Sequence, residues 1–329
     1  MTNKNSLIWV LADDRPGNYS QAIGLAAALD REYEVKKIRY NFFTRLPNCL
    51  RKGNFVGITP ETKSLLLNQS RAPQIIICAG RKAAAVGLFL KKYYKNVFVI
   101  QIMKPDLNPD KFDLVVLPEH DNFTKKDNII TSIGSLSRVD TALLKEEYKK
   151  FASKLCKIKS PKIALLVGGS SKKAKFSAEI AINMAQIVSE VVNNMKAHLL
   201  VTTSRRTEKE IIEHLKRNLK CPNLFFQWQE DKPNPYFAFL QDADYIIVSG
   251  DSMSMCSESC SLGKPVYIYN PEQICSKKHL KFHQSLFINK YARKLDKNTK
   301  RLNANSFKKL DETHAVAKKI NGLLLSKSL

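Results

Sequence analysis

Two glycines followed by two serines form the clearest candidate ligand loop in the sequence. Gly168, Gly169, Ser170 and Ser171 come directly after a short apolar run and are followed by three lysines. When such a loop precedes a helix, its backbone N–H groups can donate to the oxygens of a diphosphate. The sequence therefore predicts a diphosphate-binding loop, and an unliganded Gly-Gly turn is the alternative.

A second candidate lies in the segment 251–258, which reads Asp-Ser-Met-Ser-Met-Cys-Ser-Glu. A helix that begins near Asp251 would place Ser254 and Glu258 on one face. A carboxylate at Glu258 could then accept hydrogen bonds from two hydroxyl groups of a ribose. The alternatives are that Asp251 and Ser252 only cap the helix, and that Glu258 is a solvated charge.

A third candidate loop connects the first expected strand to a helix. It contains Asp13, Asp14, Gly17 and Asn18. Gly17 can adopt a positive φ and lets a ligand approach, while the helix start offers free N–H groups. The spacing matches neither the dinucleotide fingerprint nor the P-loop. We therefore expect a loop that binds an anion or a substrate, and a capped turn is the alternative.

A base and a phosphate clamp complete the set of candidate residues. Asp14 or His120 could accept a proton from a hydroxyl group, although His120 could equally be a structural histidine. Arg205 and Arg206 follow another expected strand, where guanidinium groups could bind phosphate oxygens. No metal site is expected, because the acidic pair at 242 and 244 precedes a strand and is interpreted as a turn.

Short apolar runs that alternate with helical patterns must position these residues. Such alternation is typical of parallel strands joined by crossover helices. The expected strands are 7–11, 34–39, 74–78, 97–102, 114–117, 163–167, 197–202, 224–228, 245–248 and 266–269. The expected helices are 19–29, 82–93, 178–193, 207–219 and 251–262.

The pattern restarts after residue 158 and predicts an α/β fold with two domains, 1–157 and 158–329. Each domain is expected to be a Rossmann-like, doubly wound parallel sheet. The Lys-rich stretch 143–158 is interpreted as a connector helix of the first domain, and 305–325 as a helix of the second. Two such domains that face each other leave a cleft at the carboxyl ends of both sheets, where open α/β sheets bind ligands.

Charge is the unusual feature of the composition. The 329 residues carry a formal net charge of +24, and much of it is clustered: 145–175 has ten Lys against two Glu, and 277–309 has eleven Lys or Arg against one Asp. Clustered basic residues attract phosphate in nucleic acid, anionic membranes or phosphorylated small molecules. A bias toward lysine codons with solvated side chains is the alternative explanation.

The remaining composition narrows the class of protein. The seven cysteines form an odd number without a Cys-x-x-Cys pair, which argues against a disulfide framework and against a zinc ribbon. The first residues lack a secretory leader pattern, and no apolar run approaches the roughly 18 residues of a membrane-spanning helix. We therefore expect a cytoplasmic protein.

One segment could nevertheless bind peripherally to the inner face of an anionic membrane. Apolar residues recur there at roughly helical spacing among basic ones, so they could form one insertable face with a basic rim. The alternative is that the segment covers the sheet of the first domain. The residues concerned are Phe42, Phe43, Leu46 and Leu50, set among Arg39, Arg45, Arg51 and Lys52.

Several motifs in order along the chain carry a resemblance to a known family. They are ADDRPGNYSQAIGLAAAL at 12–29, LPEHD at 117–121, VGGSSK at 167–172, TTSRRT at 202–207, and VSGDSMSMCSES with GKPV at 248–266. The chain thereby resembles the mitochondrial fission family founded on the plant elongated-mitochondria protein, which has many bacterial members. That family is similar to the two-domain GT-B glycosyltransferases, in particular the enzyme that adds N-acetylglucosamine to a lipid-linked muramoyl-pentapeptide.

The resemblance implies that the loop at Gly168 and Gly169 holds a nucleotide diphosphate and that Glu258 contacts its ribose. Asp13 and Asp14 stand where that transferase has a glycine-rich loop. Two functions follow as hypotheses. The first is a glycosyltransferase that needs neither metal nor cofactor, uses a nucleotide-diphosphate sugar and acts on a membrane or envelope acceptor. The alternative is a non-catalytic protein that recruits a protein partner at a membrane surface.

Nucleic-acid binding is the least supported of the explanations for the positive charge. The basic stretches lack interleaved aromatic residues, and the sequence shows no nucleic-acid-binding motif. We therefore expect no nucleic-acid partner.

Overall fold

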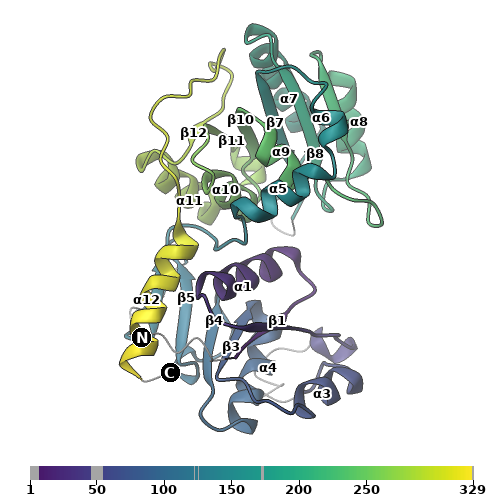
Figure 1. Cartoon of the computed structure of the whole chain (residues 1–329). Coiled ribbons are helices and arrows are strands. Elements are labelled where there is room, and N and C mark those ends of the chain that lie inside the picture. Colours follow the sequence, from purple (N-terminus) through teal and green to yellow (C-terminus); the bar gives the residue numbers. More distant parts are fainter. Residues whose placement is uncertain (1–6, 46–54, 122, 125, 172–173, 328–329) are drawn as a thin grey trace. The chain divides into compact units, whose positions relative to one another are not determined.

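The computed structural model describes residues 7–45, 55–121, 123–124, 126–171 and 174–327 (Figure 1). Its internal contacts divide the chain into two compact units. The first unit comprises Met1–Arg138 together with Asp311–Leu329, and the second comprises Val139–Leu310. This division differs from the expected one, because 139–157 joins the second unit and the C-terminal segment joins the first.

The first unit contains a six-stranded parallel sheet in the order β2-β1-β3-β4-β5-β6. Every residue of β1, β3, β4 and β5 is buried, because helices cover both faces of the sheet. The direction of winding reverses between β1 and β3. The strands are β1 (Ile8–Ala12), β2 (Tyr33–Lys37), β3 (Ile75–Ala79), β4 (Phe98–Ile102), β5 (Leu114–Pro118) and β6 (Ile129–Ser132).

Alternation along the strands sends side chains of this sheet to two different layers. Ile8 and Val10 of β1 pack with α1 and α12, whereas Trp9 packs with α3 and α4 on the other face. The helices are α1 (Pro16–Ala28), α3 (Pro60–Leu67), α4 (Gly80–Tyr93) and α12 (Glu312–Ser326), with 3-10 helices η1 (Phe42–Arg45) and η2 (Pro109–Lys111).

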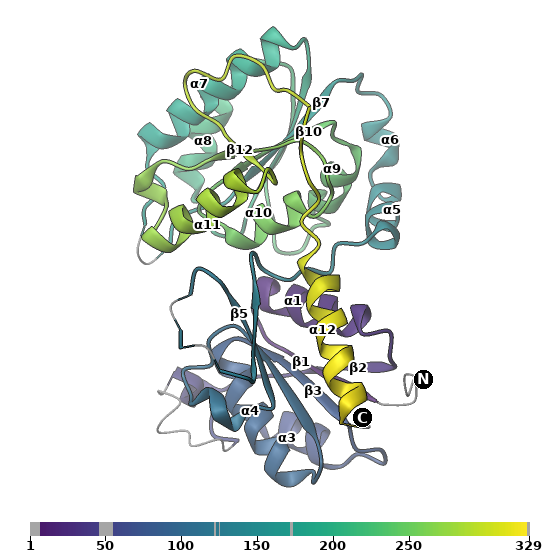
Figure 2. The same ribbon diagram turned by 90° about the vertical axis from the view of Figure 1, so that its left-hand side faces the viewer.

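The C-terminal helix α12 belongs to this first unit because it completes one of these layers. Figure 2 shows α12 alongside α1, which it contacts. Val316 and Ile320 are buried in the shared core. The Glu312 carboxylate accepts a hydrogen bond from the Ile133 N–H at 2.7 Å, and the Thr313 hydroxyl accepts one from the Ser137 N–H at 3.0 Å. These contacts fasten the start of the helix to the segment that follows β6.

The second unit contains another six-stranded parallel sheet, in the order β12-β11-β10-β7-β8-β9. Its central strand β7 is entirely buried. The chain winds outward in one direction from β7 and then in the other from β10, so the winding reverses between these two strands. The strands are β7 (Lys162–Val167), β8 (His198–Thr203), β9 (Asn223–Phe226), β10 (Tyr245–Ser249), β11 (Val266–Tyr269) and β12 (Arg293–Lys294).

Helices cover this second sheet as well. The apolar stripe of α7 packs on β7 and β8 through Ile180, Met184 and Val188. On another side α5 contacts α9, which explains why the expected connector joins the second unit (Figure 1). The helices are α5 (Thr141–Lys149), α6 (Ala152–Leu155), α7 (Ala178–Asn194), α8 (Lys209–Asn218), α9 (Tyr236–Asp242), α10 (Met253–Cys260) and α11 (Lys277–Ile288), with the 3-10 helix η3 (Glu272–Ile274).

The two parallel sheets confirm the expected fold class of two Rossmann-like units. No helix within the described part of the chain combines the length and apolar character that a bilayer crossing requires.

Candidate functional site

The carboxyl edge of the second sheet, between β7 and β10, is where an open α/β sheet forms its ligand crevice. The two strands pair in parallel, so the loops that follow them lie at the same edge. Hydrogen bonds tie these loops together. The Gly168 N–H donates to the Ser249 hydroxyl oxygen at 2.7 Å, and the Gly169 N–H donates to Asp251 Oδ2 at 2.9 Å. The Ser249 hydroxyl in turn donates to Asp251 Oδ1 at 2.7 Å.

Arg206, from the loop after β8, completes this network. Its Nη2 donates to Asp251 Oδ2 at 2.9 Å, and its Nη1 donates to the carbonyl oxygens of Gly169 and Ser170 at 2.9 and 3.2 Å. The Thr207 hydroxyl donates to the carbonyl of Gly168. The structure thus brings the predicted residues Gly168, Gly169, Arg206 and Asp251 together.

The loop at Gly168 and Gly169 differs from the expected diphosphate-binding loop in the acceptors that its backbone N–H groups bind. Both glycine N–H groups already donate to acceptors of the chain itself, so they are not available to a diphosphate in this structure. A Cβ atom at Gly169 would overlap the backbone carbonyl of Arg206. The glycines are therefore required by internal packing. Ser170 accepts a hydrogen bond from the Phe176 N–H at 3.0 Å, and Ser171 is exposed.

The start of α10 shows which of the alternatives holds for each polar residue. Ser252 is the N-cap, and its side chain accepts a hydrogen bond from the Met255 N–H. Asp251 is not the cap, because its carboxylate is held by the loop contacts described above. Burial lowers the pKa of His279, while the charge of Asp251 and a hydrogen bond with the Asp251 backbone act in the opposite direction. His279 is therefore favoured as a neutral ring that supports this turn.

Glu258 is a nearly buried carboxylate, 8% exposed, one turn beyond the half-buried Ser254. Tyr236 donates its hydroxyl hydrogen to Glu258 Oε2 at 2.7 Å. Burial raises the pKa of Tyr236 well above its usual range, and the neighbouring carboxylate raises it further. The structure therefore excludes a freely solvated helix charge at Glu258.

Sequence reasoning missed the partners of Glu258. Asn234 Oδ1 accepts hydrogen bonds from the Tyr236 N–H at 2.9 Å and from the Thr202 hydroxyl at 3.2 Å. Together with Glu258 these residues form a polar cluster beside α10. The available signal was the Pro-Asn-Pro-Tyr run at 233–236, in which an asparagine precedes a helix start.

Two further predicted features of the second unit have clear positions. Arg205 is exposed beside Arg206. The acidic pair Asp242 and Asp244 binds Lys162. The Lys162 Nζ lies 2.8 Å from Asp242 Oδ2, and the Lys162 N–H donates to Asp244 Oδ2 at 2.8 Å. These carboxylates therefore anchor the start of β7. No group of three or more His, Cys, Asp or Glu side chains suited to a metal ion occurs in the described ranges.

The first unit presents its own polar cluster where the winding reverses between β1 and β3. The Asp13 carboxylate accepts hydrogen bonds from the Asn18 side-chain amide and, at 2.7 Å, from the Asp14 N–H. Gly80, directly after β3, has a φ of +79°, and a Cβ atom there would overlap the Asn18 amide nitrogen. Gln101 Nε2 donates to the carbonyl of Ile102 at 2.6 Å beside this loop. Gly17 is half-buried in the first turn of α1.

Adjacent acids in this loop have opposite electrostatic character. Burial raises the pKa of Asp13 from its usual 3.8 to about 6, and a hydrogen bond to the Asp14 side chain adds to the effect. The same hydrogen bond lowers the pKa of Asp14, as does the ion pair with Lys82 Nζ at 2.6 Å. Asp13 is thus the carboxyl group that can exchange a proton near neutral pH, whereas Asp14 is held ionised.

His120 does not join this cluster. It is buried beyond the end of β5, which is three strands away from β1 in the sheet order. At about 4.8 Å between neighbouring strands, β1 and β5 are about 14 Å apart, so the two expected bases follow strands that are not neighbours. The two expected bases therefore occupy separate places on the first unit.

One relative of known sequence matches nearly the whole chain, and a second matches about two thirds of it. An uncharacterized protein of Rickettsia prowazekii (strain Madrid E) is 32% identical over 353 residues, covering 98% of this chain and 99% of the relative. The mitochondrial fission protein ELM1 of Arabidopsis thaliana is 25% identical over 240 residues, covering 65% of this chain. That match spans about half of the plant protein, namely 55% of its length.

Solved structures show the fold, and the family model shows the family. The UDP-GlcNAc 2-epimerase of Neisseria meningitidis, determined bound to UDP-GlcNAc, is similar with a TM-score of 0.55 at 12% identity, covering 98% of this chain and 100% of that one. The UDP-GlcNAc 2-epimerase of Methanocaldococcus jannaschii gives a TM-score of 0.54 at 13% identity, covering 96% and 99%. These likenesses show a GT-B fold. Because the model for mitochondrial fission ELM1 proteins matches residues 16–324, the chain belongs to the mitochondrial fission ELM1 family.

Proposed function

We propose that this protein binds a nucleotide-diphosphate sugar through its second unit. The observation that carries the proposal is the nearly buried carboxylate of Glu258 on α10, which accepts a hydrogen bond from Tyr236. Helix α10 follows β10, one of the two strands between which the direction of winding reverses. A fixed carboxylate at this edge of an α/β sheet suits the two hydroxyl groups of a ribose. The similar epimerase of Neisseria, which was solved with UDP-GlcNAc, supports this class of ligand.

The phosphates require donors other than the two glycine N–H groups. The first N–H groups of α10 lack partners within the helix, and the helix dipole favours an anion there. Arg205 is exposed at the same edge, and Ser171 and Ser254 can donate from their hydroxyl groups. We assign the ribose to Glu258 and the diphosphate to this set, whereas Gly168 and Gly169 support the site through Asp251.

A thermal-shift comparison tests the proposal directly. The purified chain is titrated with nucleoside diphosphates and with their sugar esters, and inorganic phosphate at matched ionic strength serves as the control. A ligand present at 100 times its dissociation constant stabilises the folded protein by about 2.7 kcal/mol. A clear shift with at least one nucleoside diphosphate is expected. No shift with any of them at millimolar concentration would contradict the proposal.

Sugar transfer is a second candidate, favoured by the raised pKa of Asp13. A carboxyl group with a pKa of about 6 is suited to accept a proton from an acceptor hydroxyl at neutral pH. Asp14 is less suited, since the hydrogen bond with the Asp13 side chain and the ion pair with Lys82 lower its pKa. On this proposal the protein is a metal-independent transferase that acts on a membrane or envelope acceptor, with Asp13 as the base.

Turnover separates transfer from a purely binding role. The sugar nucleotide is incubated with the protein and with membranes, and release of the nucleoside diphosphate is followed. Release that is lost in Asp13→Asn supports transfer. Binding without release supports the alternative, a non-catalytic protein that recruits a partner at a membrane surface.

Peripheral membrane association is proposed from the exposure of two adjacent aromatic side chains. Phe42 is 73% exposed and Phe43 is 56% exposed, so neither is covered by the sheet of the first unit. They lie on the 3-10 helix η1 and not on a longer amphipathic helix. Leu46, Leu50, Arg51 and Lys52, which belong to the same proposed face, lie outside the described residues. This proposal places the protein in the cytoplasm, at the inner face of a membrane.

A further inference from the structure

Three hydrogen-bond donors of the second unit converge on the carboxylate of Asp251. The Gly169 N–H and Arg206 Nη2 each lie 2.9 Å from Oδ2, and the Ser249 hydroxyl lies 2.7 Å from Oδ1. The Asp251 side chain is only 3% exposed. A loop N–H, a hydroxyl and a guanidinium are the groups with which proteins bind phosphate oxygens.

The same carboxylate fills the space inside the glycine loop. A Cβ atom at Gly168 would overlap both carboxylate oxygens of Asp251, so no room for another anion remains at that point. The Gly168 N–H is used by Ser249, which itself donates to Asp251. Arg206 is held in the same place by the carbonyl oxygens of Gly169 and Ser170.

We propose that Asp251 is an internal anion that takes the phosphate position of the Gly168–Gly169 loop and keeps a ligand phosphate out of it. The inference rests on the proposed function only in assuming that a nucleotide binds near by. Asp251 then determines specificity, because a bound diphosphate must lie outside the loop, on Arg205 and the first turn of α10. Without the carboxylate, Arg206 and the Gly169 N–H would be open to a free anion.

The substitution Asp251→Ala tests this with inorganic pyrophosphate as the probe. Alanine removes both the charge that neutralises Arg206 and the carboxylate that fills the loop. We expect pyrophosphate to bind Asp251→Ala at least tenfold more tightly than the unmodified chain, and added salt to weaken that binding. Combining Asp251→Ala with Arg206→Gln is expected to abolish the gain.

Unchanged pyrophosphate affinity in a folded Asp251→Ala variant would overturn the inference. A second measurement on the unmodified chain, labelled with ¹⁵N-glycine, does not depend on how the variant folds. The amide signals of Gly168 and Gly169 are expected to stay in place when pyrophosphate or UDP is added in excess. Large shifts of these two signals would show a phosphate inside the loop and also overturn it. Failure of UDP to bind would contradict the proposed function alone, since pyrophosphate decides the role of Asp251.

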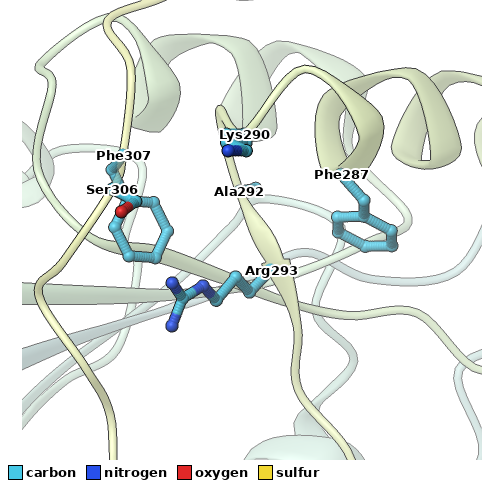
Figure 3. A pocket seen from close by; sticks show the side chains of 6 residues that line it. All are labelled: Phe287, Lys290, Ala292, Arg293, Ser306 and Phe307. Atoms are coloured by element: carbon cyan, nitrogen blue, oxygen red, sulfur yellow. The ribbon is translucent and has the colours of Figure 1, made fainter.

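An independent feature of the second unit is a cavity of about 280 Å³ between the end of α11 and β12 (Figure 3). The Lys308 N–H donates to the Lys290 carbonyl at 2.9 Å, which ties the segment that contains Ser306 and Phe307 to the turn between α11 and β12. The residues that line it are Phe287, Lys290, Ala292, Arg293, Ser306 and Phe307. None of them was singled out from the sequence as a site residue.

The charged side chains that line this cavity are both positive, and one of them, Arg293, is held in place by its neighbours. The Arg293 guanidinium lies 5.0 Å from the centre of the Phe307 ring, and its Nη2 donates to the Asn305 carbonyl at 2.9 Å. Lys290 supplies a second cation, and no acidic residue is among those that line the cavity. The surrounding segment 277–309 has eleven Lys or Arg against one Asp.

The geometry points to a binding site for a phosphate ester, with the headgroup of an anionic phospholipid as its source. Arg293 and Lys290 can pair with the phosphate oxygens. Ile288 follows the lining residue Phe287 in the chain and is 68% exposed, and an exposed aliphatic side chain at this sequence position suits contact with a lipid layer. A soluble phosphate ester would make no use of Ile288.

Flotation with liposomes tests this site on the full chain. Vesicles with anionic phosphatidylglycerol are compared with neutral phosphatidylcholine vesicles, and glycerol 3-phosphate is added as a soluble competitor. We expect the protein to float with anionic vesicles and the double variant Lys290→Gln with Arg293→Gln to lose at least half of that binding. The matched control, Lys277→Gln with Lys281→Gln, removes two charges from the same segment outside the cavity and is expected to retain more binding.

Each result of this experiment has a definite meaning. Equal losses in the two double variants would show that charge alone acts, and would overturn the site. The site would also be wrong if neither anionic vesicles nor glycerol 3-phosphate bound. Tight binding of glycerol 3-phosphate that Ile288→Ser leaves unchanged would reject the lipid as the source.

Discussion

Asp13 and Asp14 show how neighbouring residues of one type acquire different chemistry. Asp13 points into the protein, where Asn18 and the Asp14 N–H hold its carboxylate, while Asp14 pairs with Lys82. Burial raises the pKa of the first to about 6, and the hydrogen bond from Asp13 and the ion pair lower the pKa of the second. From the sequence, Asp14 was the expected base and Asp13 a ligand-binding residue, whereas the pKa directions favour Asp13 as the group that exchanges a proton.

This difference predicts a pH dependence of stability. Between pH 3.8 and about 6 the folded chain binds more protons at Asp13 than the unfolded chain, so this residue makes stability fall as the pH rises. The opposite shift of Asp14 acts below pH 3.8, outside this window. We expect the free energy of unfolding of Asp13→Asn, relative to the unmodified chain, to increase from pH 4 to pH 6.5. Urea denaturation at several pH values measures this, and parallel pH profiles would contradict it.

Two glycines give a matched test of internal packing. A Cβ at Gly169 would overlap the Arg206 carbonyl, whereas one at Gly322, inside α12, meets no atom within 4 Å. Gly169→Ala is therefore expected to lower the free energy of unfolding by about 1–3 kcal/mol. Gly322→Ala is expected to raise it by about 0.5–1 kcal/mol, as in other helix interiors. Chemical denaturation of both variants checks this, and equal effects would show that the loop at Gly169 is loosely packed.

At the scale of elements, periodicity in the sequence was sufficient to find the framework. The buried strands β1, β3, β7 and β10 are continuous apolar runs, which is why they could be located to within about a residue. The helices α3, α9 and α11 and the strands β6 and β12 were missed. Helices α3 and α9 are short, with eight and seven residues, and begin at or directly after a proline, where a periodicity search expects a loop. Helix α11 lies in the basic stretch 277–309, which was interpreted by its charge alone.

The contents of the site were harder to predict than its position. Parallel strands imply that loops gather at their carboxyl ends, which is why the loops at Gly168 and Asp251 could be expected at one edge of the sheet, where a hydrogen bond joins them. The bond that joins Gly169 to Asp251, however, links residues 82 positions apart. Nothing in local spacing shows that Asp251 satisfies the loop, or that Tyr236 holds Glu258. These contacts depend on which strands pair as neighbours in the sheet.

The 3-10 helix η1 carries the prediction for membrane association. Phe42 and Phe43 are exposed and in contact with each other, with ring centres 6.3 Å apart. Insertion of both rings should let the chain float with acidic liposomes at low salt, and salt should weaken the binding. We expect Phe42→Ser with Phe43→Ser to reduce flotation. Flotation that the double substitution leaves unchanged would remove this segment from the membrane proposal, and Tyr33→Ser, at another exposed aromatic residue, serves as the control.

For the whole molecule, the path of the chain decides the domain boundary. Residues 139–157 belong to the second unit, where their helix α5 contacts α9. The chain returns to the first unit at residue 311 and completes it with α12. A boundary drawn where the strand pattern restarts could not show this return. Periodicity identifies α12 as a helix, but its apolar stripe fits a core in either unit.

Calorimetric titration with UDP tests the central claim, that the second unit binds a nucleotide diphosphate through Glu258, most directly. The unmodified chain is expected to bind UDP at one saturable site. Glu258→Ala should weaken this binding about tenfold or more, because hydrogen bonds to a charged group are worth about 1.5–3 kcal/mol. Glu213→Ala, on the exposed face of α8, should bind like the unmodified chain. Equal affinities in all three folded proteins, or no binding of UDP or any other nucleoside diphosphate, would contradict the account.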